Sequence, residues 1–99
     1  MRYTIYISGP MTGLPELNYP TFNRAAAIFR QAGMDVRNPA DIKLPPDADW
    51  TDYMRQAVKM LLECEAIAML PGWQDSRGAK IEKQLAEDLG MQILQGIDP

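Results

Sequence analysis

Residues 66–94 read AIAMLPGWQDSRGAKIEKQLAEDLGMQIL, and this stretch decides the fold. It opens with a short apolar run at residues 66–70, which has the length and composition of a buried strand. A helical pattern follows over residues 76–89, and a second short apolar run occupies residues 91–94. A strand, a helix and a further strand in this order form a βαβ unit, which indicates a parallel sheet.

The same alternation of extended and helical patterns continues toward the amino terminus. Asn18 and Pro20 mark the start of a first helix as cap candidate and initial proline, and Gly33 marks its end. The whole chain is therefore expected to contain strands at residues 3–7, 34–37, 66–70 and 91–94, helices at residues 20–32, 50–63 and 76–89, and a loop at residues 40–49.

Handedness then fixes the order of the strands. Right-handed crossovers place the first and third strands side by side, with the second outside the first and the fourth outside the third. We predict an α/β fold, a small doubly wound, flavodoxin-like parallel sheet with its four strands in the order 2-1-3-4 and helices on both faces. With 99 residues the chain suffices for one core, so residues 1–99 are expected to form a single domain.

The composition excludes several classes of function. There is no histidine and only one cysteine, Cys64, so neither a zinc or copper cluster nor an internal disulfide is expected. Any chemistry is expected to be metal-free or to use a loosely held cation, and no cofactor is expected. A net charge of −3 disfavours binding to nucleic acid, and no segment approaches the ~20 apolar residues of a membrane span, so a small molecule is the expected partner. No signal-peptide core is apparent, which favours a cytoplasmic location. Because so small a core benefits from association, a homo-oligomer is also expected.

The predicted strand order locates a binding site. In such sheets ligands bind at the carboxyl ends of the two central strands, where the chain leaves in opposite directions. Two loops meet there, residues 8–13 (SGPMTG) and residues 71–76 (PGWQDS). Glycine, proline and hydroxyl residues suit a backbone that approaches a ligand closely, although plain turns have the same composition. The position of the loops is therefore the stronger argument.

One carboxylate falls on the apolar side of the third helix. Helical periodicity places five residues on that side: Gly78, Ile81, Leu85, Ala86 and Leu89. Glu82 lies in the middle of this stripe. Burying a carboxylate is costly unless it is paired or opens onto a cavity, so Glu82 is the first candidate for a functional residue. Alternatively, it lies near enough to the helix end to reach water or backbone amides.

Three neighbouring residues have both a functional and a structural interpretation. Ser76 either caps the third helix or, with Gly78 leaving room, helps to seat an anion at the positive helix end. Trp73 either stacks on a base or covers the sheet edge. Tyr6 either donates a hydrogen bond to Glu82 or is an ordinary tyrosine of a buried strand.

Three segments also carry a family resemblance: YISGPMTGLPELNYPTF (residues 6–22), WTDYMRQAVKMLLECEAIAMLPGW (residues 50–73) and SRGAKIEKQLAEDLGM (residues 76–91). They closely resemble a family of small uncharacterised bacterial and phage proteins, a domain of unknown function. That family is itself similar to the nucleoside 2-deoxyribosyltransferases. The resemblance covers nearly the whole chain and implies the fold of the transferases and a nucleoside or nucleotide as ligand.

The resemblance assigns roles to the candidate residues. The glutamate four residues after a glycine in the third helix is the nucleophile of the transferases, which implies that role for Glu82 after Gly78. Their tyrosine two residues before the first loop holds the glutamate, which implies that role for Tyr6. In related enzymes that cleave deoxynucleoside 5′-monophosphates a serine six residues before the glutamate contacts the phosphate, as Ser76 would here. The remaining substrate-binding candidates are Ser8, Gly9, Pro10, Met11, Gly13 and Trp73.

One position departs from the pattern of the transferases. They usually carry an aspartate on the inner face of the second helix, eight residues before the acidic start of the third strand, where it handles the leaving base. Counting back from Glu65 gives Ala57, and Asp52 lies on the opposite side of the helix.

Two functions therefore remain open, cleavage or transfer at an N-glycosidic bond through Glu82 and non-catalytic nucleotide binding or regulation on the same scaffold. A third interpretation, a protein-binding adaptor, leaves the inward Glu82 unexplained.

Overall fold

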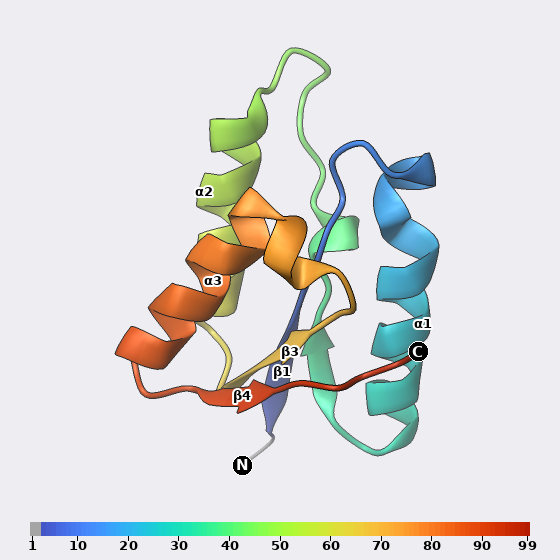
Figure 1. Ribbon diagram of the computed structural model, residues 1–99, viewed down its shortest axis with the longest axis vertical. Coiled ribbons are helices and arrows are strands. Elements are labelled where there is room, and N and C mark those ends of the chain that lie inside the picture. Colours follow the sequence, from blue (N-terminus) through green and yellow to red (C-terminus); the bar gives the residue numbers. More distant parts are fainter. Residues whose placement is uncertain (1–2) are drawn as a thin grey trace.

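The computed structural model describes residues 3–99 and contains one sheet with three longer helices (Figure 1). The elements in chain order are β1 (Thr4–Ser8), α1 (Tyr19–Gln31), β2 (Asp35–Arg37), α2 (Trp50–Leu61), β3 (Ala66–Met69), α3 (Arg77–Asp88) and β4 (Gln92–Leu94). Three short 3₁₀ turns lie between them: η1 (Pro15–Asn18), η2 (Pro39–Asp41) and η3 (Trp73–Asp75). Each predicted strand and helix is present.

The sheet confirms the predicted topology. Its strands run in the order β2-β1-β3-β4, and all three pairings are parallel. Helix α1 covers one face of the sheet, and α2 and α3 cover the other (Figure 1). The carboxyl ends of the central strands β1 and β3 therefore form the predicted switch point, with the α3 amino terminus beside it.

Side-chain alternation in β1 divides the core between these two faces. Ile7 packs with Phe22 of α1 in one cluster. Tyr6 points the other way and belongs to a cluster with Ala57 of α2 and Ala79 of α3. Both Ile7 and Tyr6 are completely buried. Ser8 follows Tyr6 by two residues, so its side chain lies on the same face of the sheet and contacts α3.

Asn18 does not play the capping role expected from the sequence. Its φ is +62°, it makes no side-chain cap bond to α1, and Glu16 and Leu17 before it also have positive φ. The Asn18 amide instead donates to the carbonyl oxygen of Pro10 at 2.9 Å. This bond ties the turn before α1 to the loop that follows β1.

The expected apolar stripe of α3 was too wide. Its buried residues are Ala79, Glu82 and Ala86, whereas Ile81 and Leu89 are 42% and 55% exposed. Ile81 borders a surface groove with Val58 of α2, and Leu89 lies beyond the last residue of the helix. The stripe in contact with the sheet is thus centred on Glu82 itself.

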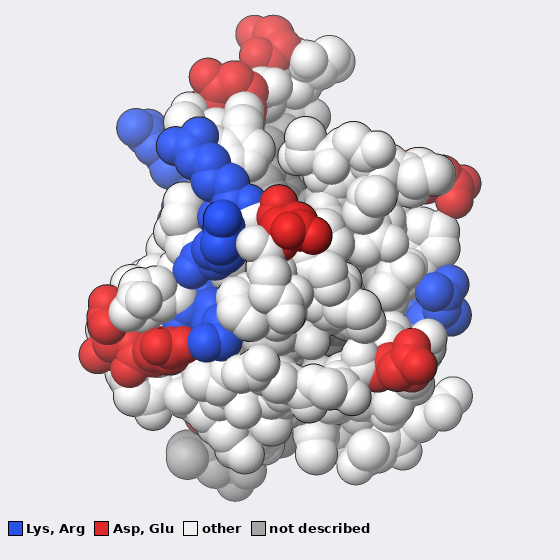
Figure 2. Space-filling model, in the orientation of Figure 1, with Lys and Arg blue, Asp and Glu red and all other residues white. Residues whose placement is uncertain are grey.

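Basic residues that are scattered along the chain gather in the folded protein. Five of the ten Lys and Arg residues lie in α2 and α3: Arg55, Lys59, Arg77, Lys80 and Lys83. Figure 2 shows Lys and Arg side chains in a band over these helices. The acidic net charge of the chain therefore coexists with a positive region beside the switch point. Within residues 3–99, no helix has the length and apolar character needed to cross a membrane.

Candidate active site

The side chain of Glu82 is held between α3 and the end of β1. It is only 4% exposed, and each of its carboxylate oxygens accepts one hydrogen bond from β1. The Tyr6 hydroxyl donates to Oε2, and the Ser8 hydroxyl donates to Oε1 at 2.7 Å. Two donors at alternate positions of one strand thus aim at the same carboxylate, which fixes its orientation.

Burial and these hydrogen bonds act in opposite directions on Glu82. Loss of water raises the pKa of its carboxyl, and the bonds from Tyr6 and Ser8 lower it; burial prevails, and the pKa rises from 4.5 to about 7. Burial, followed by the charge of Glu82, raises the pKa of the Tyr6 phenol well above its usual value. Tyr6 therefore stays neutral and can only donate to the carboxylate. Near neutral pH Glu82 is divided between its acid and its ionised form, which suits a group that gains and loses charge.

The start of α3 brings Glu82 to the switch point. The Ser76 hydroxyl accepts a hydrogen bond from the amide of Ala79 at 3.2 Å, which confirms the predicted cap. Gly78 lets α2 approach closely, because a β-carbon there would lie 3.0 Å from the sulfur of Met54. Gly9 lies against Leu70: a β-carbon at position 9 would be 2.7 Å from the Cβ atom of Leu70.

A cavity of about 700 Å³ opens beside Glu82. Of the predicted site residues, six line it: Gly9, Pro10, Met11, Ser76, Gly78 and Glu82. Tyr6 and Ser8 do not line the cavity; they hydrogen-bond to the Glu82 carboxylate from β1. Gly13 and Trp73 are not part of the lining; Trp73 packs against the core cluster of α2 and α3, with the Lys83 ammonium 5.1 Å from its ring centre.

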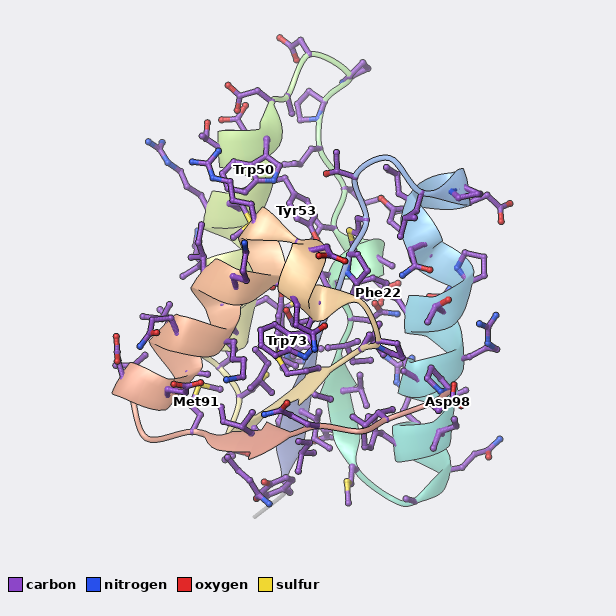
Figure 3. All side chains as sticks on the ribbon, in the orientation of Figure 1. Phe22, Trp50, Tyr53, Trp73, Met91 and Asp98 are labelled. Atoms are coloured by element: carbon purple, nitrogen blue, oxygen red, sulfur yellow. The ribbon has the colours of Figure 1, made fainter. Side chains whose placement is uncertain are left out.

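The cavity also has walls that the sequence analysis did not identify. Helix α2 contributes Trp50, Tyr53 and Met54, and the lining further includes Tyr19, Phe22, Asp75 and Arg77. Figure 3 shows Trp50 and Tyr53 on the side of α2 that faces α3. The Arg77 guanidinium lies 4.3 Å from the centre of the Trp50 ring. The sequence does carry a signal for this wall, since residues 50, 53 and 54 share one helix face, but periodicity assigns that face wholly to the core.

Ala57 lies deeper than these wall residues. It is completely buried in the cluster that contains Tyr6 and Ala79, and it is not part of the cavity lining. The inward direction predicted for position 57 is therefore confirmed.

A comparison with protein families matches residues 3–95 to the domain of unknown function DUF4406. The chain belongs to this family. The match spans every helix and strand, so the buried glutamate and its cavity lie within the DUF4406 domain. No curated protein matches the chain.

Among solved structures, this DUF4406 chain is similar to a 2-desoxiribosyltransferase from Leishmania mexicana, with a TM-score of 0.72 and 22% sequence identity. The match covers 94% of this chain and 63% of that one, so the DUF4406 domain spans less than two thirds of the length of that protein. At this identity the likeness shows a shared fold. It confirms the 2-deoxyribosyltransferase-like architecture that the sequence motifs implied.

Proposed function

We propose that this protein cleaves the N-glycosidic bond of a nucleoside or nucleoside 5′-monophosphate, with Glu82 as the nucleophile. The observation that carries the proposal is the buried Glu82 carboxylate, held by Tyr6 and Ser8 and open to a cavity large enough for such a ligand. Attack of its oxygen on the anomeric carbon gives a glycosyl-enzyme ester and releases the base. Water then resolves the ester in a hydrolase, and a second base does so in a transferase.

The walls of the cavity suit the parts of a nucleotide. The loop with Gly9, Pro10 and Met11 lies beside Glu82 and is proposed to hold the sugar. Trp50 offers aromatic surface for a base, a role that the sequence suggested for Trp73.

A nucleotide fits the charge of the site better than a nucleoside. Ser76 and Gly78 lie at the amino terminus of α3, where backbone amides and the helix dipole favour an anion. Arg77 adds a full positive charge to the same wall and offsets the neighbouring carboxylate of Asp75. We therefore propose that this end of the cavity seats the 5′-phosphate.

The experiment that tests this function follows base release from a panel of ribo- and deoxyribonucleosides and their 5′-monophosphates by chromatography. Glu82→Gln keeps the size of the side chain and removes the nucleophile, so it should abolish base release. Glu87→Gln makes the same change at an exposed position of α3 outside the cavity and should leave it intact. Equal activity of wild type and Glu82→Gln would contradict the proposal.

A second candidate function, nucleotide binding without catalysis, is favoured by Ala57, because an alanine buried at that position offers no proton to a leaving base. If the missing acid is the only group that the site lacks, Ala57→Asp should raise base release by roughly 10²-fold, the scale of general acid help. Because this change buries a carboxylate, folding is checked first by circular dichroism. A folded variant that binds nucleotides but releases no base would favour the binding function.

Association and location complete the proposal. We propose that the protein acts in the cytoplasm as a homo-oligomer. Association is supported by apolar positions on the helical surface that remain more than 40% exposed, such as Ile81, Leu62 and Leu89. Light scattering that finds only an 11.1 kDa species would contradict association.

A further inference from the structure

Cleavage of an N-glycosidic bond needs a proton as well as a nucleophile. The electron pair of the broken bond passes to a nitrogen of the base, which leaves readily only if it is protonated or receives a strong hydrogen bond. Glu82 must be ionised to attack, so it has no proton to give. The hydroxyl hydrogens of Tyr6 and Ser8 are both directed at Glu82. The donor must therefore come from another wall of the cavity.

Tyr53 has a hydroxyl in that wall that is bound only to a weak acceptor. It projects from α2 one turn before Ala57 and lines the same cavity as Glu82. Across residues 3–99, the hydrogen bond found for its hydroxyl goes to the sulfur of Met11, at 3.2 Å. A thioether is a weak acceptor, so this bond is easily exchanged for one to a nitrogen of a bound base.

The charge of Glu82 also affects how strongly the Tyr53 hydroxyl holds its proton. Burial and then the Glu82 charge raise the pKa of the Tyr53 phenol well above its usual value, so Tyr53 carries its proton when Glu82 is ionised. When Glu82 forms an ester its negative charge disappears, and the Tyr53 proton is held less strongly. The step that creates negative charge on the base thus makes Tyr53 a better acid.

The other polar groups of the cavity are placed differently. Asp75 and Arg77 are exposed residues at the start of α3, and the Arg77 guanidinium lies over the Trp50 ring. The Ser76 hydroxyl caps α3.

The hydroxyl groups of Thr12 and Tyr19 also line the cavity, but they belong to the segment between β1 and the first residue of α1. Trp50 offers an indole N–H, which is too weak an acid to protonate a leaving base. Tyr53 is the partly buried hydroxyl donor on the wall formed by α2.

We propose that Tyr53 is the proton donor to the leaving base, a role that rests on the proposed function. In the first step the bond from the anomeric carbon to the base breaks, an oxygen of Glu82 bonds to that carbon, and the base nitrogen takes the proton from the Tyr53 hydroxyl. In the second step water attacks the anomeric carbon and gives a proton to the Tyr53 phenolate. Glu82 leaves as a carboxylate, so the enzyme returns to its starting state.

The test compares leaving groups that differ in their need for a proton. Guanosine and 2′-deoxyguanosine 5′-monophosphates are set against their 7-methyl forms, whose base leaves as a neutral molecule; for a pyrimidine-selective enzyme, uracil and 5-fluorouracil serve as the poor and good leaving groups. Tyr53→Phe should slow release of the poor leaving group by roughly 10²-fold and leave the good one nearly unchanged. Tyr3→Phe, an exposed tyrosine outside the cavity, should change neither.

The outcomes separate this role from the proposed function. Equal losses on both leaving groups in Tyr53→Phe would assign Tyr53 a structural role and overturn the proposal. A selective loss in Asp75→Asn or in Tyr19→Phe instead would make Asp75 or Tyr19 the donor and overturn the proposal. If Glu82-dependent cleavage occurs only with the good leaving group, the proposed function stands and the proton donor is refuted. If wild type cleaves neither, both proposals fail.

Discussion

Replacement of Glu82 by glutamine should make the stability of the protein less dependent on pH. Glutamine occupies nearly the same volume and is neutral at every pH, whereas burial raises the pKa of the Glu82 carboxyl from 4.5 to about 7. A carboxyl whose folded-state pKa lies above its unfolded value stabilises the fold fully below pH 4.5, and this contribution is lost as the pH rises through 7.

The magnitude follows from the size of the shift. Each pKa unit corresponds to about 1.4 kcal/mol, so the free energy of unfolding of wild type should fall by about 3 kcal/mol relative to Glu82→Gln between about pH 4 and pH 8. Other titrating groups are common to both proteins and cancel in the difference. The side chain is 4% exposed, so little screening by water is expected.

Urea denaturation of both proteins across this pH range, followed by circular dichroism, measures the difference. Glu87→Gln serves as the matched control for the exchange of a carboxyl for an amide, since its side chain is exposed on the same helix. A constant difference between wild type and Glu82→Gln would mean that Glu82 titrates alike in the folded and unfolded chain. A difference of opposite sign would mean that the hydrogen bonds outweigh the loss of water.

Three further predictions concern the residues around this carboxylate. If ionised Glu82 attacks the substrate, base release should rise with pH about a midpoint near 7, and Ser8→Ala should move that midpoint upward because it removes a bond that lowers the pKa; an unmoved midpoint would exclude this role for Ser8. Gly9→Ala should cost about 1–3 kcal/mol in urea denaturation, because the added methyl group overlaps Leu70; unchanged stability would show that the loop shifts freely. Ser76→Ala should reduce the difference in affinity, measured by calorimetry, between a nucleoside 5′-monophosphate and its nucleoside. If wild type binds the two ligands equally well, the proposed phosphate site at the start of α3 is wrong.

The strand order and the meeting of Tyr6 with Glu82 could be predicted from the amino-acid sequence. Short apolar runs that alternate with helical patterns allow few arrangements once crossovers are right-handed. Glu82 stood out because a charge on an apolar stripe is costly, and the family resemblance supplied Tyr6 as its partner. The bond from Ser8 was not predicted, although Ser8 follows Tyr6 by the two residues that return a strand to the same face.

The walls of the cavity were harder to predict. Periodicity shows that Trp50, Tyr53 and Met54 face inward, but it does not distinguish contact with the core from contact with a cavity. The exposure of Ile81 has the same origin, because the width of a buried stripe depends on which neighbouring helix covers it. Asn18 could serve as a cap by type, and only the path of the chain at Pro10 gave its amide another partner.

The strand that carries Tyr6 and Ser8 has a consequence for how such proteins diverge. β1 is paired on both sides, by β2 and β3, and both hydroxyl donors are at most 1% exposed, so they belong to the most protected part of the domain. The residues of the cavity wall come instead from loops and from helices at the surface. Substitutions in the cavity wall can therefore change which ligand fits without disturbing the two hydroxyl groups that hold Glu82.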